Sequence, residues 1–150
     1  MKNLLIVIVI FFLSCSKKET VNINAYQIMI TYIGPRDAPP PEIVLRNSKT
    51  DKKVFPVTNY QIEKEDLMKI EEACYSEKTE AIKNSLVLVE INKDNHIKKY
   101  YFNKERGLKI LDRIQDLTSH YNNKFLNNDF LNLKFITKQD WYNDEGIIGR

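Results

Sequence analysis

The chain has two thiols, Cys15 and Cys74, and a thiolate is a ready nucleophile. This chemistry needs a neighbouring base or positive charge that lowers the thiol pKa. The sequence neighbours of Cys74 do the opposite, because Glu71, Glu72 and Glu77 are negatively charged and raise a thiol pKa. Cys74 also falls on the apolar face of a predicted helix. We therefore predict that Cys74 is a small buried core residue.

Histidines and acids could supply metal ligands or acid–base catalysis. His96, at a predicted turn, and His120, near a predicted helix end, have no second ligand at metal-binding spacing on the same element. Glu90 is the acid best placed for partial burial, since it alternates with leucines in an apolar strand. We interpret it as a partner of Lys99 or another base, with a catalytic acid as the alternative. No G-x-S-x-G, P-loop, G-x-G-x-x-G or zincin motif is present, so we assign no catalytic residue, metal or cofactor.

Two oppositely charged stretches follow each other in the chain. Residues 63–80 hold seven acids and three bases, whereas residues 93–113 hold seven bases and three acids. The basic stretch surrounds Tyr100, Tyr101 and Phe102, and we name Lys98, Lys99 and Arg106 as candidate binding residues. Anionic lipid headgroups, an envelope polysaccharide or the acidic helix of the same protein could meet them. Pairing within the protein is the plainest interpretation.

The loop of residues 34–41 contains four prolines, at positions 35, 39, 40 and 41. These prolines do not have the P-x-x-P spacing of an SH3 ligand. A stiff loop loses little entropy on binding and could present Arg36 and Asp37 to a partner. A rigid connection without a partner is the alternative.

The N-terminus has the pattern of a signal peptide. Lys2 is followed by an unbroken apolar run of ten residues, Leu4 to Leu13, and then by Ser14 and Cys15. Ten helical residues cover only about half of a ~30 Å hydrocarbon core, so this run is too short for a permanent transmembrane helix.

The stretch Phe12-Leu13-Ser14-Cys15 resembles the lipobox of bacterial lipoproteins, although that motif usually has Leu where Phe12 stands. The resemblance covers about the first 16 residues. It implies that the Cys15 sulfur is lipidated with a diacylglyceryl group, that the signal is removed before Cys15, and that the new amino terminus is often acylated with a fatty acid such as palmitate. Two or more acyl chains anchor a protein stably. We expect residues 1–14 to be the signal, 15–24 the lipidated cysteine and a flexible tether, and 25–150 one domain with a partly ordered C-terminal tail.

Hydrophobic periodicity predicts the elements of this domain. Period-two alternation predicts a strand over 26–33 and a hairpin of 43–47 with 54–58 around a turn at 48–51. Residues 86–89 are apolar on both faces, which predicts a central strand over 85–92. A short turn at 93–95 is expected to join it to a hairpin partner over 97–102. Helical spacing predicts a helix over 64–75 and a second one after an Asn103 N-cap, ended by Asn122-Asn123. We expect the stripe of this second helix to consist of Leu108, Leu111, Ile114, Leu117 and Tyr121. Only short apolar patches, 125–126 and 130–136, follow it.

The predicted order β-β-β-α-β-β-α indicates an α+β fold, in which two helices pack on one face of a small antiparallel sheet. The 150 residues are 43% hydrophobic and 29% charged, with a net charge of +3, which fits one globular domain and is too mild for a nucleic-acid binder. We expect a lipid-anchored protein of the bacterial cell envelope, at its periplasmic face or surface, that binds a protein or polysaccharide without catalysis. An inhibitor or immunity-type lipoprotein, and a hydrolase with dispersed carboxylates, are the alternatives. The oligomeric state is left open.

Overall fold

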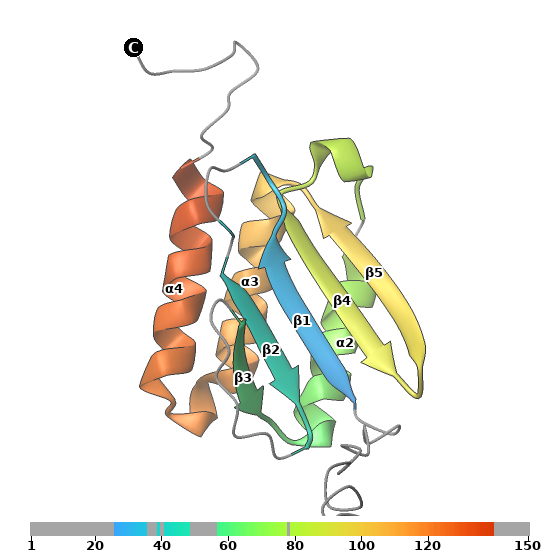
Figure 1. Cartoon of the computed structure of the whole chain (residues 1–150), viewed down its shortest axis with the longest axis vertical. Helices are drawn as coiled ribbons and strands as arrows, with labels where there is room; N and C mark the ends of the chain where they lie inside the picture. Colours follow the sequence, from blue (N-terminus) through green and yellow to red (C-terminus); the bar gives the residue numbers. More distant parts are fainter. Residues whose placement is uncertain (1–25, 36–38, 40, 49–56, 78, 140–150) are drawn as a thin grey trace, which may run out of the picture.

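The computed structural model describes residues 26–35, 39, 41–48, 57–77 and 79–139 (Figure 1). The predicted signal, Cys15, the tether, Arg36, Asp37 and the tail after residue 139 lie outside these ranges. In chain order the elements are β1 (Gln27–Tyr32), β2 (Glu42–Arg46), β3 (Val57–Gln61), α2 (Lys64–Ser76), the 3-10 turn η1 (Ile82–Asn84), β4 (Val87–Lys93), β5 (His96–Phe102), α3 (Lys104–Thr118), the 3-10 turn η2 (Ser119–Tyr121) and α4 (Lys124–Gln139).

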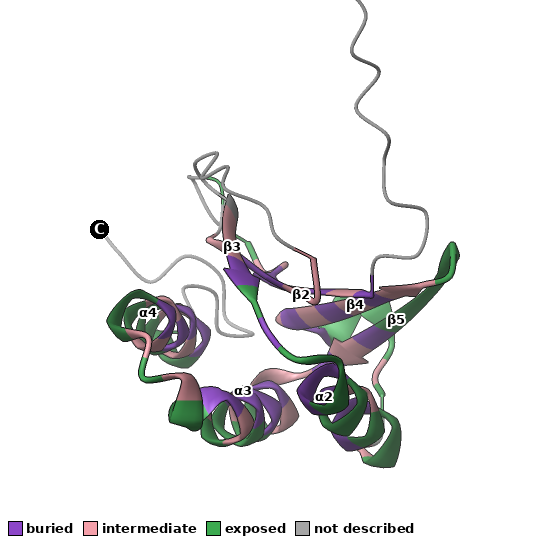
Figure 2. Ribbon diagram, turned by 90° about the horizontal axis from the view of Figure 1, so that it is seen from below, coloured by how far each residue is buried: buried purple, intermediate pink, exposed green. Residues whose placement is uncertain are grey.

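The five strands form one sheet in the order β3-β2-β1-β4-β5. Strand β1 lies at the centre and is antiparallel to β2 and β4, and β4 is antiparallel to β5. The three helices α2, α3 and α4 all cover the same face of this sheet (Figure 2). The predicted α+β class and the single helix-covered face are therefore confirmed.

The predicted hairpin between the second and third strands is wrong. Strands β2 and β3 run parallel, with Ile43 opposite Thr58 and Leu45 opposite Tyr60, so the sheet is mixed. A parallel partner requires the chain to return along the length of β2, which a tight turn cannot do. Residues 54–56 of the predicted third strand lie outside the described ranges; the described strand runs from Val57 to Gln61. Its pairing continues to Ile62, whose amide donates to the Arg46 carbonyl at 2.8 Å.

Several local signals are confirmed. The β4–β5 turn has Asp94 and Asn95 at positive φ (50° and 62°), as two-residue hairpins with primed turns require. The side chain of Asn103 accepts a hydrogen bond from the Arg106 amide at 3.0 Å and caps α3. Asn122 ends the following 3-10 turn in the left-handed region, with φ 49°.

The stripe of α3 is only partly as predicted. Leu111 and Ile114 are buried, whereas Leu108 is half-buried and Leu117 and Tyr121 are partly buried against the core. The other buried positions of α3 are Gly107, Ile110 and Thr118. Its contact face is therefore rotated slightly from the predicted one.

A third helix, α4, replaces the two apolar patches predicted after residue 124. Its buried side chains, Leu126, Phe130, Leu133 and Thr137, have the four-three-four spacing of one helical face. Two further apolar residues, Leu131 and Phe135, are exposed on its outer side and obscure this period in the sequence.

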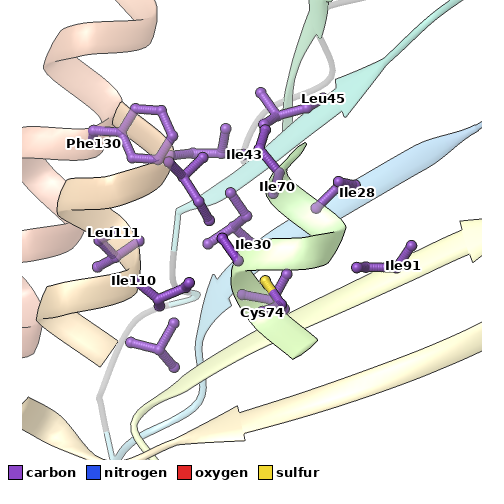
Figure 3. Packing of buried hydrophobic residues seen from close by; sticks show 14 of the residues in the cluster. Ile28, Ile30, Ile43, Leu45, Ile70, Cys74, Ile91, Ile110, Leu111 and Phe130 are labelled. Atoms are coloured by element: carbon purple, nitrogen blue, oxygen red, sulfur yellow. The ribbon is translucent and has the colours of Figure 1, made fainter. Parts of the chain in front are cut away.

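The core lies between the sheet and the helices (Figure 3). Alternate strand residues point into it, and they meet residues from all three helices. The labelled members in Figure 3 are Ile28, Ile30, Ile43, Leu45 and Ile91 from the strands and Ile70, Cys74, Ile110, Leu111 and Phe130 from the helices. Cys74 is thus a buried core residue, as predicted.

Helix α3 approaches the sheet closely at Gly107. A Cβ atom at this position would lie 2.7 Å from Cγ2 and 3.1 Å from Cβ of Val87, which is fully buried in β4. Only glycine therefore lets the first turn of α3 pack directly on β4.

We predict that Gly107→Ala lowers the free energy of unfolding by about 1–3 kcal/mol, because the added methyl group overpacks the core. This loss outweighs the gain of about 1 kcal/mol that alanine brings to a free helical position. Urea denaturation measures it. In a Val87→Ala background the same change should cost less, since the opposing methyl groups are gone. A stabilised Gly107→Ala variant would contradict this packing.

Candidate functional site

A surface groove of about 500 Å³ lies between α2 and the β4–β5 hairpin. Residues of α2 form one wall, and side chains of β4 and β5 form the other. Its lining is Glu65, Met68, Lys69, Glu71, Glu72, Tyr75, Lys93, Lys98 and Tyr100. We call it the α2 groove. It contains Lys98, one of the candidate binding residues, together with exposed apolar side chains.

The Glu71 carboxylate lines this groove and connects three parts of the chain. Tyr26, which directly precedes β1, donates its hydroxyl hydrogen to Glu71 Oε2 at 2.5 Å. Lys98 Nζ lies 3.0 Å from Oε1 and Lys93 Nζ 3.7 Å from Oε2. Lys93 also lies over the Tyr26 ring, 5.2 Å from its centroid, as in a cation–π contact.

These contacts determine the protonation of the cluster. Burial alone would raise the pKa of Glu71, but the hydrogen bonds from Tyr26 and Lys98 and the lysine charges outweigh it and lower this pKa. The pKa of the Tyr26 hydroxyl is raised by burial and by the adjacent carboxylate. Glu71 is therefore ionised and Tyr26 neutral at pH 7.

The outer wall of the groove is apolar and acidic. Met68 is 50% exposed and Tyr75 is 79% exposed, which are high values for such large apolar side chains. Glu65 and Glu72 of the same helix are also exposed and have no ion pair with another described residue. This wall can pack against a partner through Tyr75 and Met68 and can bind a basic group through the two acids.

The thiol behind this wall is unreactive. Burial raises the pKa of Cys74 to about 12, and the charge of Glu71 adds to the effect. Of the three neighbouring acids expected to raise this pKa, Glu71 is therefore confirmed, and burial is the larger cause. Cys74 provides no nucleophile at neutral pH.

The candidate basic residues are paired with acids of the same protein. Lys98 binds Glu71, Lys99 Nζ lies 3.0 Å from Glu90, and Arg106 forms an ion pair with Glu80. Outside the candidate set, Lys109 pairs with Glu77 at 2.7 Å. Pairing between the acidic and basic stretches, the plainest interpretation of their charges, is confirmed.

Glu90 lies on the sheet face that no helix covers. Across the ladder it faces Met29 of β1 on one side and Lys99 of β5 on the other. The predicted pairing with Lys99 is confirmed, and these neighbours give Glu90 the environment of a surface ion pair.

A second charged cluster escaped the sequence analysis. Asp66, buried in the first turn of α2, accepts hydrogen bonds from Lys69 Nζ at 2.9 Å and Tyr121 Oη at 2.8 Å. His120 Nε2 lies 3.0 Å from the same carboxylate. The Tyr121 oxygen in turn accepts the Glu63 amide hydrogen at 2.7 Å. Because 54 residues separate Asp66 from His120, no local spacing could reveal this cluster.

The Asp66 cluster joins the start of α2 to the turn η2 that follows α3. Burial would raise the pKa of Asp66, but the hydrogen bonds from Lys69 and Tyr121 outweigh it and this pKa is lowered. Burial and Asp66 raise the pKa of Tyr121 to about 12, against the opposing hydrogen bond from the Glu63 amide. With its carboxylate occupied by three neighbours, Asp66 acts as a connection between helices.

Comparisons with known proteins assign neither a family nor a function to this chain. No protein family, curated protein or solved structure matches this chain. Within the described ranges, no three His, Cys, Asp or Glu side chains gather as metal ligands would. The helices in those ranges are too short or too polar for any of them to cross a bilayer.

We predict that Glu71→Gln lowers the free energy of unfolding at pH 7 by about 1–2 kcal/mol, because charged hydrogen bonds to a half-buried group are lost. Glu72→Gln is the matched control. It removes an exposed neighbouring charge without a described ion pair and should change stability by less than about 0.5 kcal/mol. Equal effects of both variants in urea titrations would contradict the role of Glu71.

The same pair of variants gives a pH prediction. A carboxyl pKa that is lowered on folding stabilises the protein above its unfolded value and loses this contribution as the pH falls. The stability difference between the native chain and Glu71→Gln should therefore shrink as the pH drops below 4.5, the ordinary value for this group. Urea titrations at several pH values measure it. A difference that grows on acidification would show that the pKa of Glu71 is not lowered.

Proposed function

We propose that this chain is a lipid-anchored protein of the bacterial cell envelope whose α+β domain binds another macromolecule without catalysis. The observation that carries the anchor is the sequence Phe12-Leu13-Ser14-Cys15 after ten apolar residues. Lipidation of Cys15 would hold the domain at a membrane through residues 16–24. The envelope location, the anchor and the partner all belong to this proposal.

The α2 groove supports the binding role. Its outer wall exposes Tyr75 and Met68, and aromatic side chains and methionine are enriched at protein interfaces. The candidate bases are largely neutralised by Glu71, Glu80 and Glu90, which argues against a partner chosen by positive charge, such as a nucleic acid. A protein with an apolar and basic contact surface suits the wall better, and an inhibitor would use the same contacts.

The anchor is tested by metabolic labelling with palmitate. Cys15→Ala should abolish incorporation of the label into the protein. The unlabelled protein should also be released from the membrane fraction. Cys74→Ala is the matched control, because its thiol is buried and should not accept lipid. Labelling that survives in Cys15→Ala would rule out this anchor.

Binding at the α2 groove is tested with a photoreactive amino acid at position 75 in living cells. We expect a discrete cross-linked product that is lost when Met68→Ala is added. The same group at position 82 is the control, since Ile82 is also exposed (64%) but lies outside the groove. Equal products at both positions, or none at position 75, would contradict a contact in this groove.

A further inference from the structure

Helix α4 has a second apolar stripe on the side away from the core. At about 100° per residue, Lys124, Leu131, Phe135 and Lys138 fall within about 60° of one another. Leu131 is 56% exposed and Phe135 is 61% exposed, although both are large and apolar. A helix that packs one face on a core normally has polar residues on the opposite face. We call these four residues the α4 stripe.

The position of α4 in the fold leaves this stripe uncovered by the other helices. Helix α4 lies at one side of the helical layer, where its neighbouring helix is α3, and it also contacts β1 and β2 (Figure 2). Phe125, at the start of the helix, adds a further exposed aromatic ring.

The exposed charges on the α4 stripe favour an anionic partner. Lys124 and Lys138 are exposed, one at each end, and neither has an ion pair with a described acid. The acid beside the stripe, Asp112 of α3, forms an ion pair with Lys134. Asp129 turns away and accepts the Tyr60 hydroxyl hydrogen at 2.5 Å. Apolar side chains between lysines are typical of helices that lie in a membrane interface, where the lysine amines reach the headgroups.

We propose that the α4 stripe docks on the anionic headgroup surface of the membrane to which the chain is anchored. This inference rests on the proposed lipid anchor. Leu131 and Phe135 would enter the boundary between headgroups and acyl chains, and Lys124 and Lys138 would bind lipid phosphates. The helix would lie along the membrane surface. Its 16 residues extend about 24 Å, which is too short to cross a hydrocarbon core of ~30 Å.

Because the proposed anchor already holds the domain near the membrane, a small apolar stripe is sufficient for docking. From Cys15 to Tyr26 the chain takes 11 steps, which span at most about 40 Å, so the domain stays within one domain diameter of the lipid. Tethering converts docking into an intramolecular event and raises the effective concentration of the surface. A weak contact is then populated without any high intrinsic affinity.

A second copy of the chain suits the stripe less well. A large aromatic side chain offers on the order of 150–250 Å² when fully exposed. Phe125, Leu131 and Phe135 are 56–64% exposed and together expose at most about 450 Å² on this scale. A stable dimer buries about 800 Å² on each partner. Two copies would also bring the unpaired lysines of both stripes together, which is unfavourable.

Docking through α4 would also orient the domain. Helix α3 separates α4 from α2 in the helical layer (Figure 2). The α2 groove lies beyond α2, toward the β4–β5 hairpin. With α4 on the lipid, the groove would therefore face away from α4 and remain open to a partner.

The test places one tryptophan on the stripe of the full-length protein. Phe135→Trp, with the native Trp141 changed to Phe, is purified from membranes and reconstituted into vesicles with and without anionic lipid. Lipids brominated on the acyl chains quench a tryptophan that enters the interface. Ile82→Trp in the same background is the matched control, because its exposure resembles that of Phe135. Ile82 belongs to the turn η1, which lies on the β5 side of the fold, away from α4 (Figure 1). Thermal melts confirm that each variant is folded.

We expect strong quenching for Phe135→Trp in anionic vesicles and weak quenching for Ile82→Trp. Lys124→Glu with Lys138→Glu should weaken docking by at least about fivefold for each lysine, because each basic residue near an anionic surface contributes about that factor. Equal quenching at positions 135 and 82 would overturn the inference. A tryptophan at position 135 that is shielded from acrylamide before lipid is added would also overturn it, since a second copy or another segment then covers the stripe.

Palmitate labelling of the same preparations separates this inference from the proposed function. Labelled protein with equal quenching at both positions would keep the anchor and overturn docking. Unlabelled protein with selective quenching at position 135 would overturn the anchor and retain docking as a property of the α4 surface.

Discussion

The domain depends on the burial of one face of a five-stranded sheet beneath three helices. Strands β1, β2 and β4 contribute alternate side chains to this interface, and Ile28, Ile30 and Ile91 are essentially inaccessible to solvent. Close packing extends to the backbone at Gly107, where a single methyl group would meet Val87. Because all helices lie on one side (Figure 2), every exposed apolar side chain on their outer surfaces is additional to what folding requires.

Electrostatics complete the same arrangement. The acids of residues 63–80 and the bases of residues 93–113 meet when α2 packs beside the β4–β5 hairpin and α3. Half-buried acids such as Glu71 and Glu77 form ion pairs with exposed lysines. These pairs cancel much of the local charge, and each adds modest stability. The proposed partner of the α2 groove would therefore meet little net charge and would be recognised through shape, apolar contact and the acids Glu65 and Glu72.

The sequence predicts much of this fold because its signals are local. Alternation identifies β1, and cap and turn residues such as Asn103 and Asn95 set boundaries within a few residues. Contacts between distant segments are not encoded in any local spacing. The parallel pairing of β2 with β3 depends on how the chain returns between them, and the cluster of Asp66 with His120 depends on the packing of α2 against α3. The α2 groove is likewise formed only when α2 lies beside the β4–β5 hairpin.

Helix α4 was not predicted for a different reason, and this reason bears on function. Its buried residues repeat with a clear helical period, but Leu131 and Phe135 add apolar residues at positions that a one-sided helix leaves polar. The pattern fails as a folding signal because it serves two surfaces, the core and something outside the domain. Departures from local consistency are expected where function imposes a second requirement. The exposed apolar residues that obscure α4 in the sequence are thus the ones that fit it to lie on lipid.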